Sequence, residues 1–123
     1  MKVISWILQA LLAIAFLGAG FSKLSMPHAE LMTQEGMAWV GDFSPIQIQI
    51  ISVLELLGAI GVIIPMFIDK LKRLVPIAAF GLALTMIGAI IVHIGRGESF
   101  MIQTVLLLLA LGTTYLRKDL LKG

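Results

Sequence analysis

One acidic residue in this sequence stands alone inside a long apolar stretch. Glu55 is the only charged residue within positions 46–68. If this stretch crosses a membrane as a helix, Glu55 lies about 13 Å from its start, at about 1.5 Å per residue. A charged carboxylate near the centre of a membrane helix costs about 2.5–3.5 kcal/mol on the insertion scale, so it faces the protein interior and needs partners. Glu55 is therefore the first candidate for a functional site.

The chemistry open to Glu55 depends on its partner. Without a neighbouring cation, a buried carboxyl group is protonated at neutral pH and donates a hydrogen bond to a carbonyl or quinone oxygen. With a cation beside it, the group stays charged and binds a polar head group. A third alternative is a purely structural ion pair with Lys23 or His93 that fixes the register of the helices. The sequence leaves these alternatives open.

Further polar residues flank the apolar stretches on the side where Glu55 lies. They are Lys23, Gln47, Ser52, His93 and Gln103. Under the topology derived below they converge with Glu55 on one layer, which predicts a ligand-binding pocket that opens toward, or is lidded from, the non-cytoplasmic side. Plainer interpretations remain. Lys23 can extend to the lipid headgroups, His93 can be an ordinary interfacial residue, and the glutamines and Thr104 can be interhelical hydrogen-bonding groups or headgroup-level residues.

Four apolar stretches must position these residues. They cover positions 3–24, 46–68, 74–94 and 100–116, against the about 20 apolar residues that cross about 30 Å of hydrocarbon. The chain is 59% hydrophobic and 13% charged, compared with about 25% charged in a soluble domain. Short connections after the second and third stretches favour antiparallel neighbours. We expect an all-α membrane protein, with one antiparallel four-helix transmembrane bundle over residues 1–123.

The basic residues predict the orientation of this bundle. Seven of the nine Lys and Arg residues fall at the chain ends and in the 69–73 loop, whereas Lys23 and Arg96 fall on the other side. Short loops rich in Lys and Arg stay in the cytoplasm, which predicts a multi-pass protein of the cell (inner) membrane with both termini cytoplasmic. The cations form no stripe, so no nucleic acid partner is expected. A cleaved signal peptide is the alternative for the first stretch, but its length favours an uncleaved helix.

The longest loop, residues 25–44, is too apolar for a free linker. Ser25 can cap a short helix with Pro27 in its first turn, and Glu30 suits the N-terminus of that helix. We expect a short interfacial or re-entrant helix that lids the non-cytoplasmic end of the bundle. The alternative is an aromatic-belt segment anchored by Trp39.

Helical periodicity assigns faces to the stretches. One face of the first stretch carries Ser5, Gln9, Ala13, Phe16, Gly20 and Lys23. In the second stretch, Glu55 lies at the edge of a face with Gln47, Gly58, Gly61 and Pro65. The third stretch has a small-residue face of Ala78, Gly81, Thr85 and Ala89. Small residues are expected to let neighbouring helices approach closely.

Several kinds of chemistry are excluded or unsupported. The chain has no cysteine and two histidines, His28 and His93. The absence of cysteine excludes disulfides, thiol redox chemistry and thiolate metal sites within the chain, and a metal centre is not expected. No nucleophile–base pair, phosphate-binding loop or cofactor motif is evident, so independent catalytic activity is not expected either.

Three segments together resemble the DoxX-like family of small four-helix membrane proteins. They are FLGAGFSKL at 16–24, SVLELLGAIGVIIP at 52–65 and HIGRGE at 93–98. The resemblance implies a functional acid at Glu55 and points to Lys23 and His93. It also implies a connection to quinones, because members of the wider family are named for a subunit of a membrane thiosulfate:quinone oxidoreductase, while others resemble partners of oxidative-stress enzymes.

Three functions are compatible with this sequence. We expect a subunit that binds a small amphiphile, a quinone or a lipid, within or beside a membrane redox or stress-response complex. The second is a proton-coupled small-molecule exporter that uses Glu55. The third is a membrane assembly factor without a ligand. Besides the lipid bilayer, a larger membrane complex and a second copy of the chain are the expected kinds of partner.

Overall fold

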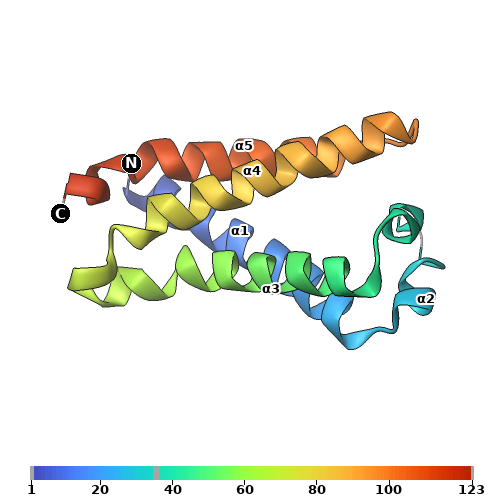
Figure 1. The fold of residues 1–123 in the computed structure, drawn as a ribbon. Coiled ribbons are helices and arrows are strands. Elements are labelled where there is room, and N and C mark those ends of the chain that lie inside the picture. The colour runs from blue at the N-terminus through green and yellow to red at the C-terminus, as the bar shows by residue number, and fades with distance from the viewer. Residues whose placement is uncertain (1, 35–36, 123) are drawn as a thin grey trace.

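The computed structural model describes residues 2–34 and 37–122 of the chain. Four longer helices dominate this described part, and it contains no strand (Figure 1). They are α1 (Lys2–Ser25), α3 (Pro45–Gly61), α4 (Leu74–Gly95) and α5 (Met101–Leu116). The predicted all-α class is therefore confirmed, and the four apolar stretches fall on these four helices.

Three of these segments are long and apolar enough to cross a membrane. They are α1, the segment Pro45–Phe67 and α4. The fourth helix, α5, is apolar but has 16 residues, which rise about 24 Å at about 1.5 Å each. The helices support a multi-pass membrane protein.

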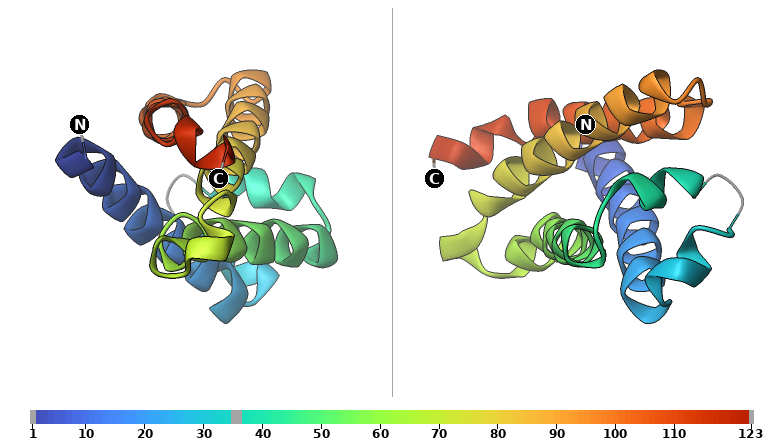
Figure 2. Two further views of the ribbon diagram at one scale, coloured as in Figure 1. Left: turned by 90° about the vertical axis from the view of Figure 1, so that its left-hand side faces the viewer. Right: turned by 45° about the vertical axis from the view of Figure 1, so that its right-hand side comes forward.

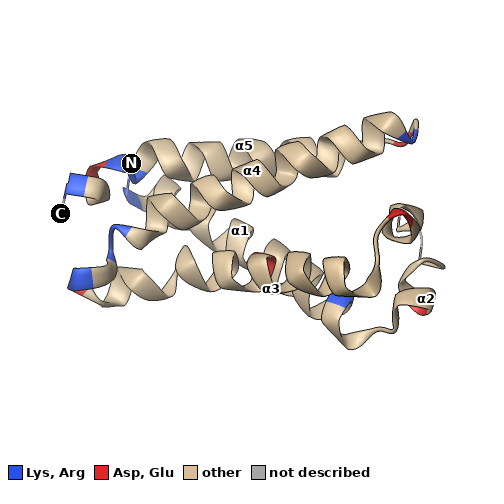
Figure 3. Ribbon diagram, in the orientation of Figure 1, with Lys and Arg blue, Asp and Glu red and all other residues tan. Residues whose placement is uncertain are grey.

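The two ends of the bundle differ in charge. One end, here called the basic end, holds both chain ends and the connection between α3 and α4 (residues 2–6, 62–74 and 115–122). The other, the loop end, holds the connection between α1 and α3 and the turn between α4 and α5 (residues 23–34, 37–45 and 93–103) (Figure 1). Lys and Arg gather at the basic end (Figure 3). The direction of the bundle in a membrane remains a prediction.

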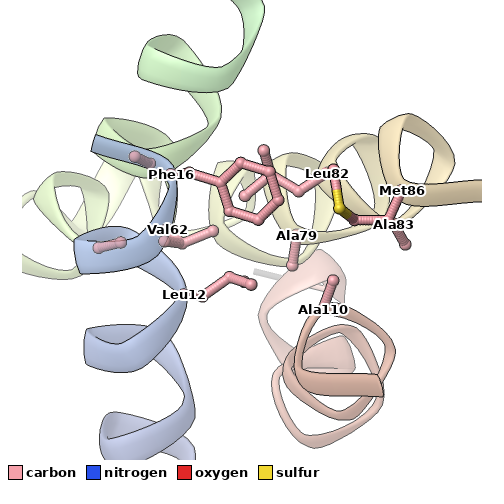
Figure 4. Packing of buried hydrophobic residues seen from close by; sticks show 10 residues of the cluster. Leu12, Phe16, Val62, Ala79, Leu82, Ala83, Met86 and Ala110 are labelled. Atoms are coloured by element: carbon pink, nitrogen blue, oxygen red, sulfur yellow. The ribbon is translucent and has the colours of Figure 1, made fainter. Parts of the chain in front are cut away.

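The helices pack as two pairs. α1 lies mainly against α3, and α4 lies mainly against α5 (Figure 2). The pairs meet through contacts of α1 with α5 and of α3 with α4, whereas α1 and α4 touch little in the described chain. The central core contains Phe16, Leu12 and Val62 from one pair and Leu82 and Met86 from the other (Figure 4).

The predicted faces fare differently. The face predicted for α1 is confirmed, because all six of its residues are buried. On α3, Glu55 lies within the buried face rather than at its edge, together with Ile48, Ser52 and Ala59.

The small-residue face predicted for α4 is confirmed only in part. Ala78 and Ala89 pack against the core, and a Cβ atom at Gly61 of α3 would lie 2.8 Å from the Ala78 Cβ, whereas Gly81 is exposed. The buried residues of this helix are Val75, Pro76, Ala79, Leu82, Ala83, Met86 and His93. Larger side chains of α4 fill the core, and a Cβ atom at Gly81 or Gly88 would meet nothing within 4 Å. Those two glycines therefore leave space beside α4 instead of bringing a helix close to it.

The end of α3 is irregular. The α-helix ends at Gly61 and continues as the 3₁₀-helices η2 (Ile64–Phe67) and η3 (Asp69–Leu71). Pro65 has no N–H to donate, and the Met66 N–H donates to the Ile63 carbonyl at 3.1 Å. The Val62 carbonyl is consequently free of its usual helical donor, the Met66 N–H. It accepts from the side-chain amide of Gln9 on α1 instead.

The 25–44 segment, described over residues 25–34 and 37–44, is packed onto the bundle. It contains α2 (His28–Leu31) and the 3₁₀-helix η1 (Ala38–Asp42). Leu31 and Val40 bury themselves against Ile48 of α3, and His28 Nε2 lies 3.1 and 2.9 Å from two carbonyl oxygens of the same segment. The expected cap at Ser25 is wrong, because α1 continues to this residue and its hydroxyl donates to the Ser22 carbonyl.

Candidate binding site at the loop end

A buried ion pair joins α1 to α3. Lys23 Nζ lies 2.5 Å from Glu55 Oε1, and the two residues are 9% and 2% exposed. One turn before Lys23, a Cβ atom at Gly20 would lie 2.8 Å from Leu56 Cγ and 3.0 Å from the Ser52 carbonyl oxygen. Glycine at this position therefore lets α1 approach α3 closely enough for the pair to form. The structure therefore gives Glu55 a cation partner, which is common to two of its alternatives, the charged binding group and the structural ion pair with Lys23.

A second polar group comes from α4 and α5. His93 is 4% exposed; its Nδ1 lies 2.9 Å from Glu98 Oε1, and its Nε2 lies 3.2 Å from Gln103 Nε2. Because a carboxylate only accepts hydrogen bonds, Nδ1 carries the hydrogen and Nε2 accepts from the glutamine amide. His93 thus links the two helices, and its carboxylate partner is Glu98 rather than Glu55, which was one of the alternatives.

Glu98 reaches His93 through the turn that ends α4. Gly97 has a φ of 70°, a left-handed conformation that glycine adopts without steric cost. The Gly97 and Glu98 N–H groups then donate to the carbonyls of Ile94 and His93 at 3.0 and 2.8 Å, the Schellman arrangement of a helix C-terminus. This turn returns the chain toward α4, so that residue 98 lies beside residue 93.

Arg96 connects this turn to the 25–44 segment. Its Nη1 donates to both carboxylate oxygens of Asp42 at 2.9 and 2.8 Å, and its Nε lies 3.2 Å from Glu98 Oε2. The hydrogen bonds to Asp42 and then Glu98 raise the pKa of Arg96. For Glu98, desolvation is the largest single influence and raises the pKa, but hydrogen bonds from His93 and Arg96 and their charges together lower it below its ordinary value.

Trp39 covers the polar groups from the 25–44 segment. Its ring centroid lies 5.8 Å from Lys23 Nζ and 6.0 Å from the ring of His93, with the two rings inclined at 72°. Trp39 was named in the sequence only as the anchor of an alternative aromatic-belt segment, and neither Trp39 nor Glu98 was among the expected site residues. Neither contact is visible in local spacing, because both depend on how the two connections fold back.

A cavity of about 760 Å³ lies beneath this segment. Its polar lining includes Lys23, Glu55, His93 and Gln103, from all four main helices, and most of the remaining lining is apolar. Leu54 and Leu84 also line it, although each is 54% exposed on the outside of the bundle. The cavity therefore extends to the outer surface between α3 and α4.

The two other expected site residues lie elsewhere. Gln47 is exposed and forms a capping box with Ser44 at the start of α3: its N–H donates to Ser44 Oγ at 3.2 Å, and its Oε1 accepts from the Ser44 N–H at 2.9 Å. Ser52 is fully buried and donates to the Ile48 carbonyl at 2.7 Å. Neither lines the cavity. Their hydrogen bonds serve the helix instead, a common use of Ser and Gln at these positions.

Comparisons with known proteins place the chain in a family. The model of the DoxX-like family matches residues 7–114, a range that includes the ion pair, His93 and Gln103. A comparison with curated proteins and one with solved structures give no match. The matched range covers far more than half of the sequence, and the apolar helices agree with it. The chain is therefore a multi-pass membrane protein that belongs to the DoxX-like family.

Proposed function

We propose that this protein binds a small amphiphile, a quinone or a lipid, in the loop-end cavity, as a binding or accessory subunit of a membrane complex. One observation carries the proposal: a cavity of about 760 Å³ has its polar groups gathered around Lys23, Glu55, His93 and Gln103 and is otherwise largely apolar. Ligand sites commonly measure about 300–1,000 Å³ and combine an apolar lining with a few polar groups.

The polar groups suit a head group with acceptor oxygens. Lys23 has three N–H donors, of which the contact with Glu55 occupies one. Gln103 also has a second amide hydrogen beyond the one directed at His93. Because Lys23 and Glu55 balance each other's charge, the head group need not be ionic. The carbonyl oxygens of a quinone meet these requirements, so we prefer a quinone to a charged lipid.

The lateral extent of the cavity suits a ligand that arrives through the bilayer. Leu54 and Leu84 line the opening between α3 and α4. Two glycines in the lining, Gly18 of α1 and Gly88 of α4, leave free space because no atom lies within 4 Å of where their Cβ atoms would be. An isoprenoid or acyl tail can occupy this space while the head group contacts Lys23.

The proposal includes the placement of the protein in the membrane. The bundle is antiparallel, its basic end faces the cytoplasm, and the 25–44 segment lies at the opposite interface as a lid. The gathering of Lys and Arg at the basic end supports this direction. The ion pair between Asp42 and Arg96 holds the lid to the α4–α5 turn.

Quenching of Trp39 fluorescence tests ligand binding directly. The chain has two tryptophans, and Trp39 lines the cavity whereas Trp6 lies at the basic end. In a Trp6→Phe background, titration with a short-chain ubiquinone in nanodiscs should quench Trp39 saturably. Gly88→Leu, which fills the cavity, should weaken this binding at least about tenfold, equivalent to about 1.4 kcal/mol.

A matched control separates filling of the cavity from any effect on α4. Gly81→Leu introduces the same side chain two turns earlier, where a Cβ also meets nothing within 4 Å but where the residue does not line the cavity. It should leave quenching unchanged. Linear, non-saturable quenching, or equal affinity in the Gly88→Leu and Gly81→Leu proteins, would contradict the proposal. The exporter and the ligand-free assembly factor would then regain priority.

A further inference from the structure

A second buried cation lies at the basic end, far from the cavity. Arg117 directly follows α5 and is 9% exposed. Its Nε donates to Gln9 Oε1 at 2.8 Å, and its guanidinium carbon lies 5.7 Å from the centre of the Trp6 ring. An arginine at the end of a membrane helix usually extends toward the headgroups and water. Arg117 instead folds back against α1.

Gln9 is fixed in place by the irregular end of α3. It is fully buried, and its Nε2 donates to the Val62 carbonyl at 2.6 Å. This is the carbonyl that Met66 leaves free of its helical hydrogen bond. The amide oxygen of Gln9 is thereby turned toward Arg117, but an amide supplies no negative charge.

Arg117 consequently lacks a counter-charge within the described chain. No carboxylate oxygen there lies within 4.0 Å of its nitrogens, and its buried Nη2 has no hydrogen-bond partner. Asp69 lies 3.2 Å from Lys72 instead. Burial lowers the pKa of Arg117, yet a guanidinium stays protonated. A buried charge of this kind calls for an anion.

We propose that Arg117 binds the phosphate group of an anionic phospholipid in the leaflet at the basic end. A planar guanidinium suits phosphate oxygens, and basic sites between membrane helices bind anionic head groups. Positive charge is added at the same end by Lys2 at the start of α1 and by Lys118 and Lys122 in the last 3₁₀-helix; Figure 3 shows that Lys and Arg gather at this end. Nη2 is covered by protein atoms, so binding also displaces the side chains that cover it.

The aromatic residues beside Arg117 suit a lipid interface. Trp6 is 37% exposed and packs beside Phe67, with 6.0 Å between ring centroids. Tyr115 is 65% exposed, and the centroid of its ring lies 4.2 Å from Lys118 Nζ. Trp and Tyr favour the headgroup region of a bilayer. These rings therefore place Arg117 at a depth that lipid phosphates reach.

The test compares the full chain in nanodiscs of phosphatidylcholine with and without phosphatidylglycerol. Native mass spectrometry and the thermal midpoint report on the lipid. We expect phosphatidylglycerol to be retained and to raise the midpoint of the wild-type protein. Arg117→Gln should weaken this retention about tenfold, because it removes the charge-assisted hydrogen bonds. Lys118→Gln, which removes the neighbouring exposed cation, should retain most of the lipid.

A second variant keeps the proposal testable if Arg117→Gln fails to fold. Gln9→Glu places a carboxylate beside Arg117 Nε, and this ion pair offsets the loss of the amide donor to the Val62 carbonyl. The variant should reduce phosphatidylglycerol retention while keeping the arginine. Equal retention by the wild-type, Arg117→Gln and Gln9→Glu proteins would overturn the proposal, and so would a loss in Lys118→Gln as large as in Arg117→Gln. If inorganic phosphate raised the midpoint equally in pure phosphatidylcholine, the site would bind a soluble anion and the lipid assignment would be wrong. Because this test does not use Trp39 fluorescence, its outcome is independent of the test for ligand binding in the loop-end cavity.

Discussion

The two ends of this molecule each bury a cation against a polar side chain of another helix. At the loop end, Lys23 of α1 meets the carboxylate of Glu55 on α3. At the basic end, Arg117 meets the uncharged amide of Gln9 on α1. The first cluster is balanced in charge and adjoins a cavity, so it suits a neutral ligand. The second cluster is one negative charge short, so it suits an anion. Burial of a cation therefore does not by itself define the chemistry of a site.

Removal of one partner of the balanced pair should have the largest effect. Glu55→Leu leaves Lys23 buried without a counter-charge, which should lower the free energy of unfolding by about 3–5 kcal/mol. The double variant Lys23→Met, Glu55→Leu removes both charges and should recover most of that loss while abolishing quinone binding. Unfolding in mixed detergent micelles measures both. An equally unstable double variant would show that the contact does not act as a pair.

Removal of the amide at the basic end should have the next largest effect. Gln9→Leu leaves the Val62 carbonyl without a donor and Arg117 Nε without an acceptor, each at about 1–3 kcal/mol. The free energy of unfolding should fall by about 2–6 kcal/mol, the sum of the two. Gln49→Leu, on an exposed glutamine of α3, is the control and should change it little. A Gln9→Leu protein as stable as this control would contradict the bridging role of Gln9.

Replacement of Arg117 sharpens the comparison between the two ends. In nanodiscs of phosphatidylcholine alone, Arg117→Met should change the free energy of unfolding by less than about 1 kcal/mol. Relief of an unpaired buried charge offsets the lost hydrogen bond to Gln9. Chemical denaturation in the nanodisc checks this value. A loss as large as that of Glu55→Leu would mean that Arg117 has a counter-charge and that the two ends are alike.

The smallest expected effect concerns pH at the loop end. The pKa of Glu98 is lowered in the folded protein, so the ionised carboxylate stabilises the fold. This stabilisation is complete above the ordinary pKa of about 4.3. It is lost as pH falls through the lower pKa of the folded protein. The thermal midpoint of the wild-type protein should exceed that of Glu98→Gln at pH 5–7, and the difference should vanish under more acidic conditions. A difference that persists unchanged at pH 3 would contradict this account.

The sequence predicted the features that follow from composition and helical period. The four apolar stretches and the buried face of α1 are confirmed. Lys23, Glu55, His93 and Gln103 line one cavity, as their positions near one end of the stretches suggested. That they bind a ligand remains a proposal.

Other features depend on side-chain direction and turn geometry, which periodicity does not specify. Arg117 follows the last apolar stretch and was assigned to the cytoplasmic chain end, yet its long side chain reaches back to Gln9. Glu98 meets His93 only because Gly97 adopts a left-handed turn. At Gly88 the missing side chain leaves space in the cavity and does not bring a neighbouring helix close. A glycine in an apolar stretch looks the same in the sequence in either case.

The difference in length between α5 and α1 has a consequence for the surrounding bilayer. The 24 residues of α1 rise about 36 Å, and the 16 residues of α5 rise about 24 Å. Hydrophobic mismatch costs a fraction of a kcal/mol per Å, and lipids adapt by thinning beside a short helix. The membrane around this protein should accordingly be asymmetric, with shorter or more disordered acyl chains enriched along the α5 flank. A thin host membrane would then favour its insertion over a thick, sterol-rich one.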